Sequence, residues 1–193
     1  MEAKYWANKW FSGTPVLNRT DADVNFGWGE GEIIPGVASN YVSVEWSGFL
    51  LPTYSEAYTF VVHVNDGVKV WVGETVVIDS LVDVSGTEVR LTSTAFTLSA
   101  GVFTPLRIQY YEATGTAFIA LYWQSTSQTL EILPTTSLYY WRSHVPIAST
   151  STTHTVEARF TPRRATALAQ GAVDTYKATA LTLVWSAPTD TGC

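Results

Sequence analysis

Apolar and polar residues alternate with a period of two in one segment of this chain after another. In residues 41–49, for example, Val42, Val44 and Trp46 fall on one face. This period is typical of a β-strand that turns one face to a core and the other to water. Clusters of Gly, Pro, Asn, Asp or Ser separate the segments, and only residues 164–172 carry a weak helical pattern. The sequence therefore predicts an all-β protein, built as an antiparallel β-sandwich or barrel.

The strand boundaries follow from the alternating segments and from the turn residues between them. The clearest predicted strands are residues 41–49, 58–64, 68–72, 104–111 and 117–123, with shorter candidates at 4–10, 76–78, 89–92 and 96–98. Asn65-Asp66-Gly67 lies between two of these segments, and Asp-Gly is one of the strongest signals of a hairpin turn. Segments 72–74 and 113–116 have the same turn chemistry. We therefore expect hairpins at all three places.

The chain changes character after residue 145. Residues 146–155 are rich in Ser and Thr and contain almost nothing that could build a core, which indicates a linker. Beyond it, only residues 155–160 and 180–185 look like strands, and two strands rarely fold alone. We predict a β-sandwich domain over residues 1–145, a linker over 146–155 and a partial domain over 156–193.

Charge and hydropathy limit the partners that this chain can have. Residues 1–141 hold 6 Lys and Arg against 14 Asp and Glu, and an acidic body repels phosphate backbones, so nucleic acid is a poor partner. No apolar run approaches the roughly 18 residues of a membrane-spanning helix, so we expect no membrane insertion. The single cysteine, Cys193, allows no internal disulfide.

Short motifs rich in aromatic residues follow one another along the first 141 residues. They are Tyr5-Trp6-Ala7-Asn8-Lys9-Trp10-Phe11-Ser12-Gly13, Arg19-Thr20-Asp21, Phe26-Gly27-Trp28-Gly29, Val42-Ser43-Val44-Glu45-Trp46-Ser47-Gly48, Tyr58-Thr59-Phe60, Asn65-Asp66-Gly67-Val68-Lys69-Val70-Trp71-Val72, Val77-Ile78-Asp79, Ile108-Gln109-Tyr110-Tyr111-Glu112 and Leu121-Tyr122-Trp123. In this order and spacing they closely resemble the PA14 domain family, and the resemblance covers about residues 3–141.

The resemblance implies an antiparallel β-sandwich or barrel of PA14 type. Domains of this family are found in bacterial toxins, as non-catalytic modules inserted in glycosidases, and in adhesins, where they act as calcium-dependent lectins. Residues 156–193 resemble, less specifically, the opening strands of a fibronectin type III domain, through Pro162, the run 180–185 and the segment 186–192. The two resemblances together imply neighbouring β domains in the same chain.

The resemblance to PA14 lectins also implies a calcium site at Asn65 and Asp66. In those lectins two adjacent aspartates joined by a cis peptide chelate the ion, and the ion then coordinates sugar hydroxyls. Oxygen ligands suit this hard cation, and Asn65 keeps a carbonyl oxygen but removes one charge. The second calcium loop of the family corresponds to Glu112, Thr114 and Gly115. The residues also allow simpler interpretations, in which the first loop is only a hairpin turn and Glu112 is a solvated charge.

Three other places are weaker candidates for a functional site. Trp28 lies in a glycine-rich loop, where it could stack on a sugar or cap the core. Asn18 begins an Asn-Arg-Thr acceptor for N-glycosylation, which matters only in the secretory pathway. The acidic residues from Asp21 to Glu32 match the spacing of a calcium-binding EF-hand. However, Phe26 stands where that loop needs glycine, and no helices flank the segment.

We predict a non-catalytic carbohydrate-binding or adhesion module of a larger surface or secreted protein, with calcium as its candidate cofactor and glycans or a protein as its partner. No nucleophile elbow or zinc-ligand spacing is present, so we expect no enzyme. Two alternatives stay open: a structural or protein-interaction module in a multidomain surface or filament protein, and an accessory domain of a glycosidase. The expected location is extracellular or at the cell surface, although the lack of a signal-peptide pattern leaves an intracellular location open.

Overall fold

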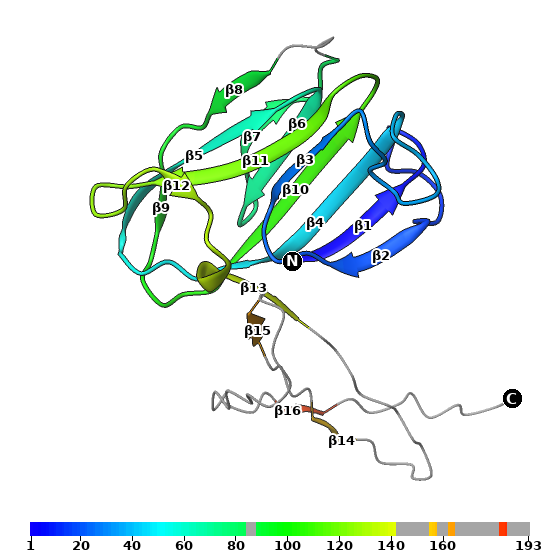
Figure 1. Ribbon diagram of the computed structural model, residues 1–193. Helices are drawn as coiled ribbons and strands as arrows, with labels where there is room; N and C mark the ends of the chain where they lie inside the picture. Colours follow the sequence, from blue (N-terminus) through cyan, green and yellow to red (C-terminus); the bar gives the residue numbers. More distant parts are fainter. Residues whose placement is uncertain (84–87, 142–154, 158–161, 165–181, 185–193) are drawn as a thin grey trace, which may run out of the picture. The chain divides into compact units, whose positions relative to one another are not determined.

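The computed structural model describes residues 1–83, 88–141, 155–157, 162–164 and 182–184. The chain divides into two compact units, and the first contains Met1–Tyr140. In this unit two antiparallel sheets lie face to face (Figure 1). The fold is therefore an all-β antiparallel sandwich, as the alternating sequence pattern predicts.

The first sheet has the strand order β13-β4-β10-β6-β7, with β1 paired to β4 and β2 paired to β1. Its strands are β1 (Glu2–Trp6), β2 (Leu17–Thr20), β4 (Val42–Leu50), β6 (Gly67–Val72), β7 (Thr75–Ser80), β10 (Thr104–Glu112) and β13 (Leu138–Trp141). The strand β4 pairs with β10 along its whole length, from Val42 opposite Glu112 to Leu50 opposite Thr104. The start of β4 and the end of β10 therefore lie at the same end of the sandwich.

The second sheet has the order β12-β11-β5-β8, with β3 paired to β11 and β9 paired to β5. Its strands are β3 (Asn25–Gly29), β5 (Glu56–Val64), β8 (Val89–Thr92), β9 (Phe96–Leu98), β11 (Ala117–Gln124) and β12 (Glu131–Ile132). One turn of 3-10 helix, η1 (Thr135–Ser137), precedes β13. The part of the chain that the structure describes contains no helix long and apolar enough to cross a membrane.

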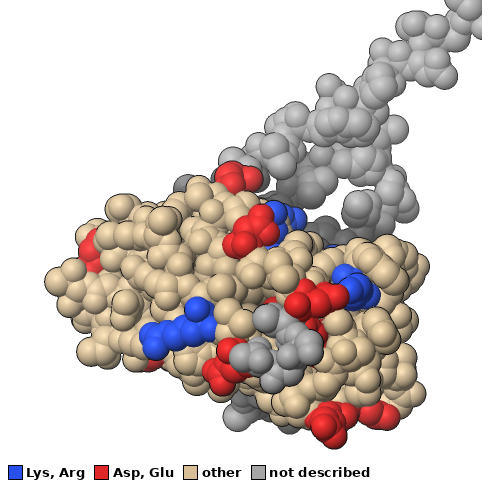
Figure 2. Space-filling view, turned by 90° about the horizontal axis from the view of Figure 1, so that it is seen from above, with Lys and Arg blue, Asp and Glu red and all other residues tan. Residues whose placement is uncertain are grey.

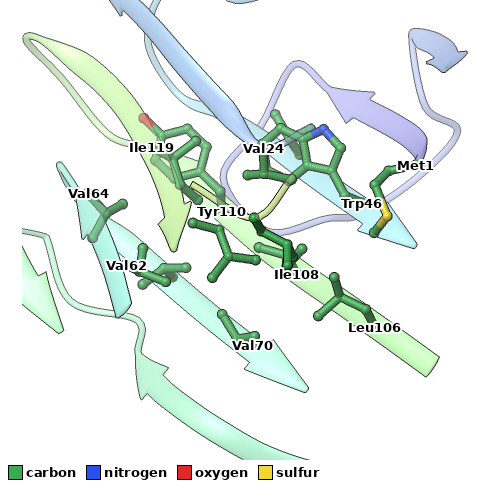
Figure 3. Close-up of a cluster of buried hydrophobic side chains, with 14 of the residues drawn as sticks. Met1, Val24, Trp46, Val62, Val64, Val70, Leu106, Ile108, Tyr110 and Ile119 are labelled. Carbon is green, nitrogen blue, oxygen red and sulfur yellow. The ribbon is translucent and has the colours of Figure 1, made fainter. Parts of the chain in front are cut away.

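The core lies between the two sheets. Figure 3 shows side chains from the first sheet meeting side chains from the second. Trp46, Val70 and Ile108 come from the first sheet, Val62 and Ile119 come from the second, and all five are completely buried. Burial of a large apolar side chain stabilises a fold by about 1.5–3 kcal/mol. The period-two pattern thus acts by giving each sheet one apolar face that only the other sheet can cover.

The five clearest predicted strands are confirmed to within two residues at each end. The strand predicted over residues 4–10 is wrong at its end, because β1 stops at Trp6 and the chain then forms a loop. The strands β2, β3, β12 and β13 were not predicted, although the equally short strands β8 and β9 were predicted at residues 89–92 and 96–98.

Two of the three predicted hairpins are wrong. Gly73 does turn the chain between the paired strands β6 and β7, with a φ of 58° that glycine adopts without strain. Asn65-Asp66 instead connects β5 of the second sheet to β6 of the first, and residues 113–116 connect β10 of the first sheet to β11 of the second. Turn-forming residues indicate that the chain changes direction but not whether it returns to the same sheet.

Beyond residue 141 the structure describes three short strands, β14 (Thr155–Glu157), β15 (Pro162–Arg164) and β16 (Thr182–Val184). The strands β14 and β16 pair antiparallel and fall within the predicted runs 155–160 and 180–185. The linker at 146–155, the helical pattern at 164–172, the fibronectin-like segment and Cys193 lie largely or wholly outside the described residues. The division into domains and the fibronectin resemblance stay predictions.

Candidate functional site

The two connections between the sheets lie side by side at one end of the sandwich. The register places Gly67, which follows the first connection, opposite Tyr111, which precedes the second. The two connections are also joined directly, because Asp66 Oδ2 accepts a hydrogen bond of 2.7 Å from the backbone N–H of Ala113. The structure thus brings the two sequence-predicted calcium loops together.

The local backbone fixes Asp66 in an uncommon conformation. Its φ is 64°, in the left-handed region that non-glycine residues rarely adopt. The backbone N–H of Asn65 donates to the carbonyl of Phe118 at 3.1 Å, which holds the connection against β11. A Cβ added to Gly67 would lie 2.0 Å from the Tyr111 ring, so glycine is needed there for close packing. No cis peptide occurs among the described residues, and in this respect the loop differs from the pattern implied by the lectins.

Asn65, Asp66 and Glu112 are all buried, with 1%, 2% and 0% of their surfaces exposed. The interpretation of Glu112 as a solvated charge at a strand end is therefore wrong. The pKa of Glu112 is raised to about 7, first because burial disfavours its charged form and further because the Asp66 carboxyl acts on it through its charge and through a side-chain hydrogen bond. The Tyr110 hydroxyl, which donates to Glu112 Oε2 at 3.0 Å, acts in the opposite direction.

Two oxygens of this cluster are buried without a hydrogen-bond partner, Asn65 Oδ1 and Glu112 Oε1. Leaving such a group unsatisfied costs about 1–3 kcal/mol, and more when the group is charged. A hard cation that takes oxygen ligands would satisfy amide and carboxylate oxygens together, so these residues fit calcium. Among the described residues no group of three His, Cys, Asp or Glu side chains could hold a metal. A cation would therefore need the Asn65 amide and further oxygens beside the two carboxylates.

The other sequence-predicted site residues lie around this cluster or apart from it. Thr114 and Gly115 are exposed on the second connection. The Trp28 ring is half-buried and stacks on Phe26 and Tyr110 at centroid distances of 4.8 and 5.9 Å. This packing supports the core-capping interpretation of Trp28, and a sugar contact there stays a prediction. Asn18 is exposed on β2, and its glycosylation also stays a prediction.

Asp21 has a structural role that the EF-hand spacing did not indicate. Its carboxylate is nearly buried and accepts hydrogen bonds from the Tyr5 hydroxyl at 2.6 Å and from Trp46 Nε1 at 2.8 Å. Arg19 Nε forms an ion pair with the other carboxylate oxygen at 2.7 Å. Both oxygens are thus engaged in joining β1, β2 and β4. This agrees with the rejection of an EF-hand at this segment.

Sequence reasoning missed the loop residues that border the cluster. Asn40 accepts a hydrogen bond from the N–H of Gly115 at 3.2 Å, and the N–H of Tyr41 donates to the carbonyl of Ala113 at 3.1 Å. The predicted strand over residues 41–49 includes Tyr41, but in the structure β4 begins at Val42. No local signal in the sequence distinguishes a strand residue from the last residue of the preceding loop.

The face shown in Figure 2 is formed mostly by residues other than Lys, Arg, Asp and Glu. The charged side chains of both signs are scattered over its described part, without a broad basic area. A surface of this kind lacks the basic stripe that usually tracks a phosphate backbone.

Comparison with known proteins agrees with the fold of the sandwich. The model of the PA14 domain matches residues 1–137. The chain belongs to the PA14 domain family. Among curated proteins, anti-sigma-I factor RsgI3 of Acetivibrio thermocellus is 35% identical over 139 residues, which make up 72% of this chain and 21% of that protein. The chain therefore spans about a fifth of the curated relative.

Solved structures give the same fold in different proteins. An anti-sigma factor domain-containing protein has a TM-score of 0.68 and 31% identity over 80% of this chain and 51% of that chain. A PA14 sugar-binding domain from an RTX adhesin has a TM-score of 0.51 and 17% identity, over 68% of this chain and 92% of that chain. At this lower identity the likeness establishes the fold alone.

Proposed function

We propose that this chain is a non-catalytic carbohydrate-binding module in which Asn65, Asp66 and Glu112 contribute oxygen ligands to a calcium ion. The observation that carries the proposal is the pair of buried, unpartnered oxygens, Asn65 Oδ1 and Glu112 Oε1, beside the Asp66 carboxyl. These groups weaken the fold as they stand, so their presence is best explained by a ligand that they serve.

The roles of the three residues follow from their positions. Asp66 is held between the sheets by the Ala113 N–H, which fixes its carboxylate. Glu112 adds a second carboxylate, and Asn65 adds a neutral carbonyl oxygen. A bound calcium ion would be able to coordinate the hydroxyl oxygens of a sugar. Since Asn65 contributes no charge, we expect weaker calcium affinity than two adjacent aspartates would give.

Sugar binding as the outcome of this site is supported by the adhesin domain of the same fold, whose name records that it binds sugar. The two relatives named as anti-sigma factors favour a second candidate role for the whole protein, in which the module binds its ligand as part of a regulatory protein. The roles are compatible, because both require the module to bind a ligand. A module that serves only as a protein-interaction surface would leave the buried oxygens unexplained.

The proposal is tested by binding of the full chain to an array of glycans and soluble polysaccharides, in millimolar calcium and in EDTA. Wild-type protein is expected to bind at least one glycan in calcium and none in EDTA, and Asp66→Ala is expected to bind none in either. Asp79→Ala is the matched control, because Asp79 is an exposed carboxylate on β7 that pairs with Lys69 at 2.6 Å, and it should bind as wild type does. Glycan binding that persists in EDTA would refute the role of calcium.

A further inference from the structure

Three described non-glycine residues have φ in the left-handed region: Phe11 at 54°, Tyr41 at 54° and Asp66 at 64°. They belong to three separate loops, and all three loops lie at the same end of the sandwich. The hydrogen bonds of Asp66 and Tyr41 both end on Ala113, and the N–H of Phe11 donates to the hydroxyl of Ser43, two residues after Tyr41. Strained backbone of this kind gathers at binding sites, where the surrounding structure holds it in place.

The loop over residues 7–13 is braced so that it presents Trp10 to solvent. Asn8 Oδ1 accepts the backbone N–H groups of Trp10 at 3.0 Å and of Ser12 at 3.3 Å. The Ser43 hydroxyl donates to the carbonyl of Asn8 at 2.7 Å and so fastens the loop to β4. Trp10 is nevertheless 69% exposed, so this bracing does not serve to bury its ring.

Tyr41 is presented in the same way beside the proposed calcium site. It is 55% exposed, although its backbone is held by the carbonyl of Ala113, the residue between Glu112 and Thr114. Its neighbour Asn40 caps the Gly115 N–H on the same connection. Trp10 and Tyr41 are the two most exposed aromatic side chains among the large hydrophobic residues that the structure describes.

We infer that Tyr41 and Trp10 form an aromatic platform that stacks on the apolar face of a pyranose ring at this end of the sandwich. An exposed aromatic ring contributes little to the stability of the fold, whereas the left-handed backbone conformation of Tyr41 lowers that stability. A ligand that covers the ring accounts for both features, because an aromatic face binds flat apolar surface and tolerates polar groups around it. The expected ligand is a saccharide with vicinal hydroxyls and one apolar ring face.

This inference rests on the proposed function, and the test separates the two. The ligand for titration is the array glycan that the wild-type chain binds most tightly. If several glycans bind equally, methyl β-galactoside and methyl β-glucoside are used instead. All titrations are done in the presence of calcium. Tyr41→Ala and Trp10→Ala are each expected to raise the Kd about tenfold, and Tyr41→Phe is expected to bind as wild type does. The calcium affinity of all three variants should be unchanged, because neither aromatic side chain supplies a ligand oxygen.

Tyr54→Ala is the matched control. Tyr54 is 41% exposed, but it follows the end of β4 and so lies at the opposite end of the sandwich. Tyr41→Gly keeps the test valid if alanine is poorly tolerated, because glycine adopts the φ of 54° without strain. It should melt no lower than wild type and still lose sugar affinity.

The outcomes are distinct. Wild-type affinity in Tyr41→Gly and Trp10→Ala would overturn the platform and leave the proposed function intact. An equal loss in Tyr54→Ala would also overturn it, since the effect would then not be local. Failure of the wild-type chain to bind any glycan would overturn the proposed function and this inference with it.

Discussion

A carboxylic acid that is completely buried beside a second carboxyl, as Glu112 is beside Asp66, weakens a fold unless something compensates for its charge. Tyr110 provides one hydrogen bond to Glu112 Oε2, but Glu112 Oε1 has no such partner. At the scale of single residues the cluster is therefore adapted to a cation rather than to stability. This contrasts with Asp21, whose buried carboxylate is paired with Arg19 and bonded to Tyr5.

The first prediction concerns the charge of Glu112. Glu112→Gln keeps the shape and the acceptor for Tyr110 but cannot ionise, so it should stabilise the calcium-free protein by about 2 kcal/mol at pH 8. Urea unfolding in EDTA measures the difference. At pH 5, where the Glu112 carboxyl is protonated in the folded state, the two proteins should be nearly equal. A glutamine variant that is less stable than wild type at pH 8 would show that the Glu112 carboxylate does not destabilise the fold.

At the scale of elements, the site is made by two connections that leave one sheet and enter the other. Alternation along a strand determines which face is buried, and this is why β4, β5, β6, β10 and β11 could be predicted closely from sequence. The same pattern says nothing about which strands become neighbours. The pairing of the Asp66 connection with the Ala113 connection depends on contacts between residues 47 positions apart, which no local signal contains.

The prediction at the scale of elements concerns Gly67. Its hydrogen atom faces the Tyr111 ring where β6 meets β10. Gly67→Ala would place a methyl group 2.0 Å from that ring, so β6 or Tyr111 must move, at a cost of about 1–3 kcal/mol. Since Asp66 is the preceding residue, calcium affinity should fall as well. Thermal unfolding and calcium titration together measure both effects.

Gly27→Ala is the control for this substitution. Gly27 also lies in a strand, but a Cβ there meets nothing within 4 Å and its φ is not positive. Its stability should change by less than about 0.5 kcal/mol. A Gly67→Ala variant that behaves like Gly27→Ala would contradict the close packing of β6 on Tyr111.

At the scale of the whole molecule, the first unit combines a well-covered core with one end that is poorly stabilised. The core residues of the two sheets are almost all fully buried, whereas the end that carries Asp66 and Glu112 holds strained backbone and unpartnered oxygens. The sequence indicated the fold and the resemblance indicated Asn65, Asp66 and Glu112. The burial of these residues and the exposure of Tyr41 and Trp10 could not be predicted, because both depend on how loops from distant segments pack.

This arrangement predicts a pH dependence of stability. The pKa of Glu112 is raised from 4.5 to about 7 in the folded protein. Its contribution to stability is therefore fully present below pH 4.5 and is lost as the pH rises through 7. In EDTA the free energy of unfolding should fall between pH 5 and pH 8, and saturating calcium should remove most of this fall. Equal pH profiles with and without calcium would argue against Glu112 as a ligand.

The central claim is that the buried oxygens of Asn65, Asp66 and Glu112 serve a cation. Calorimetric titration of the chelator-stripped full chain with calcium at pH 8 tests it most directly, with Asp66→Ala as the comparison. We predict saturable binding at one site in the wild-type protein, and no measurable heat of binding in Asp66→Ala. Absence of binding by the wild-type protein up to millimolar calcium, or undiminished binding by Asp66→Ala, would contradict the account.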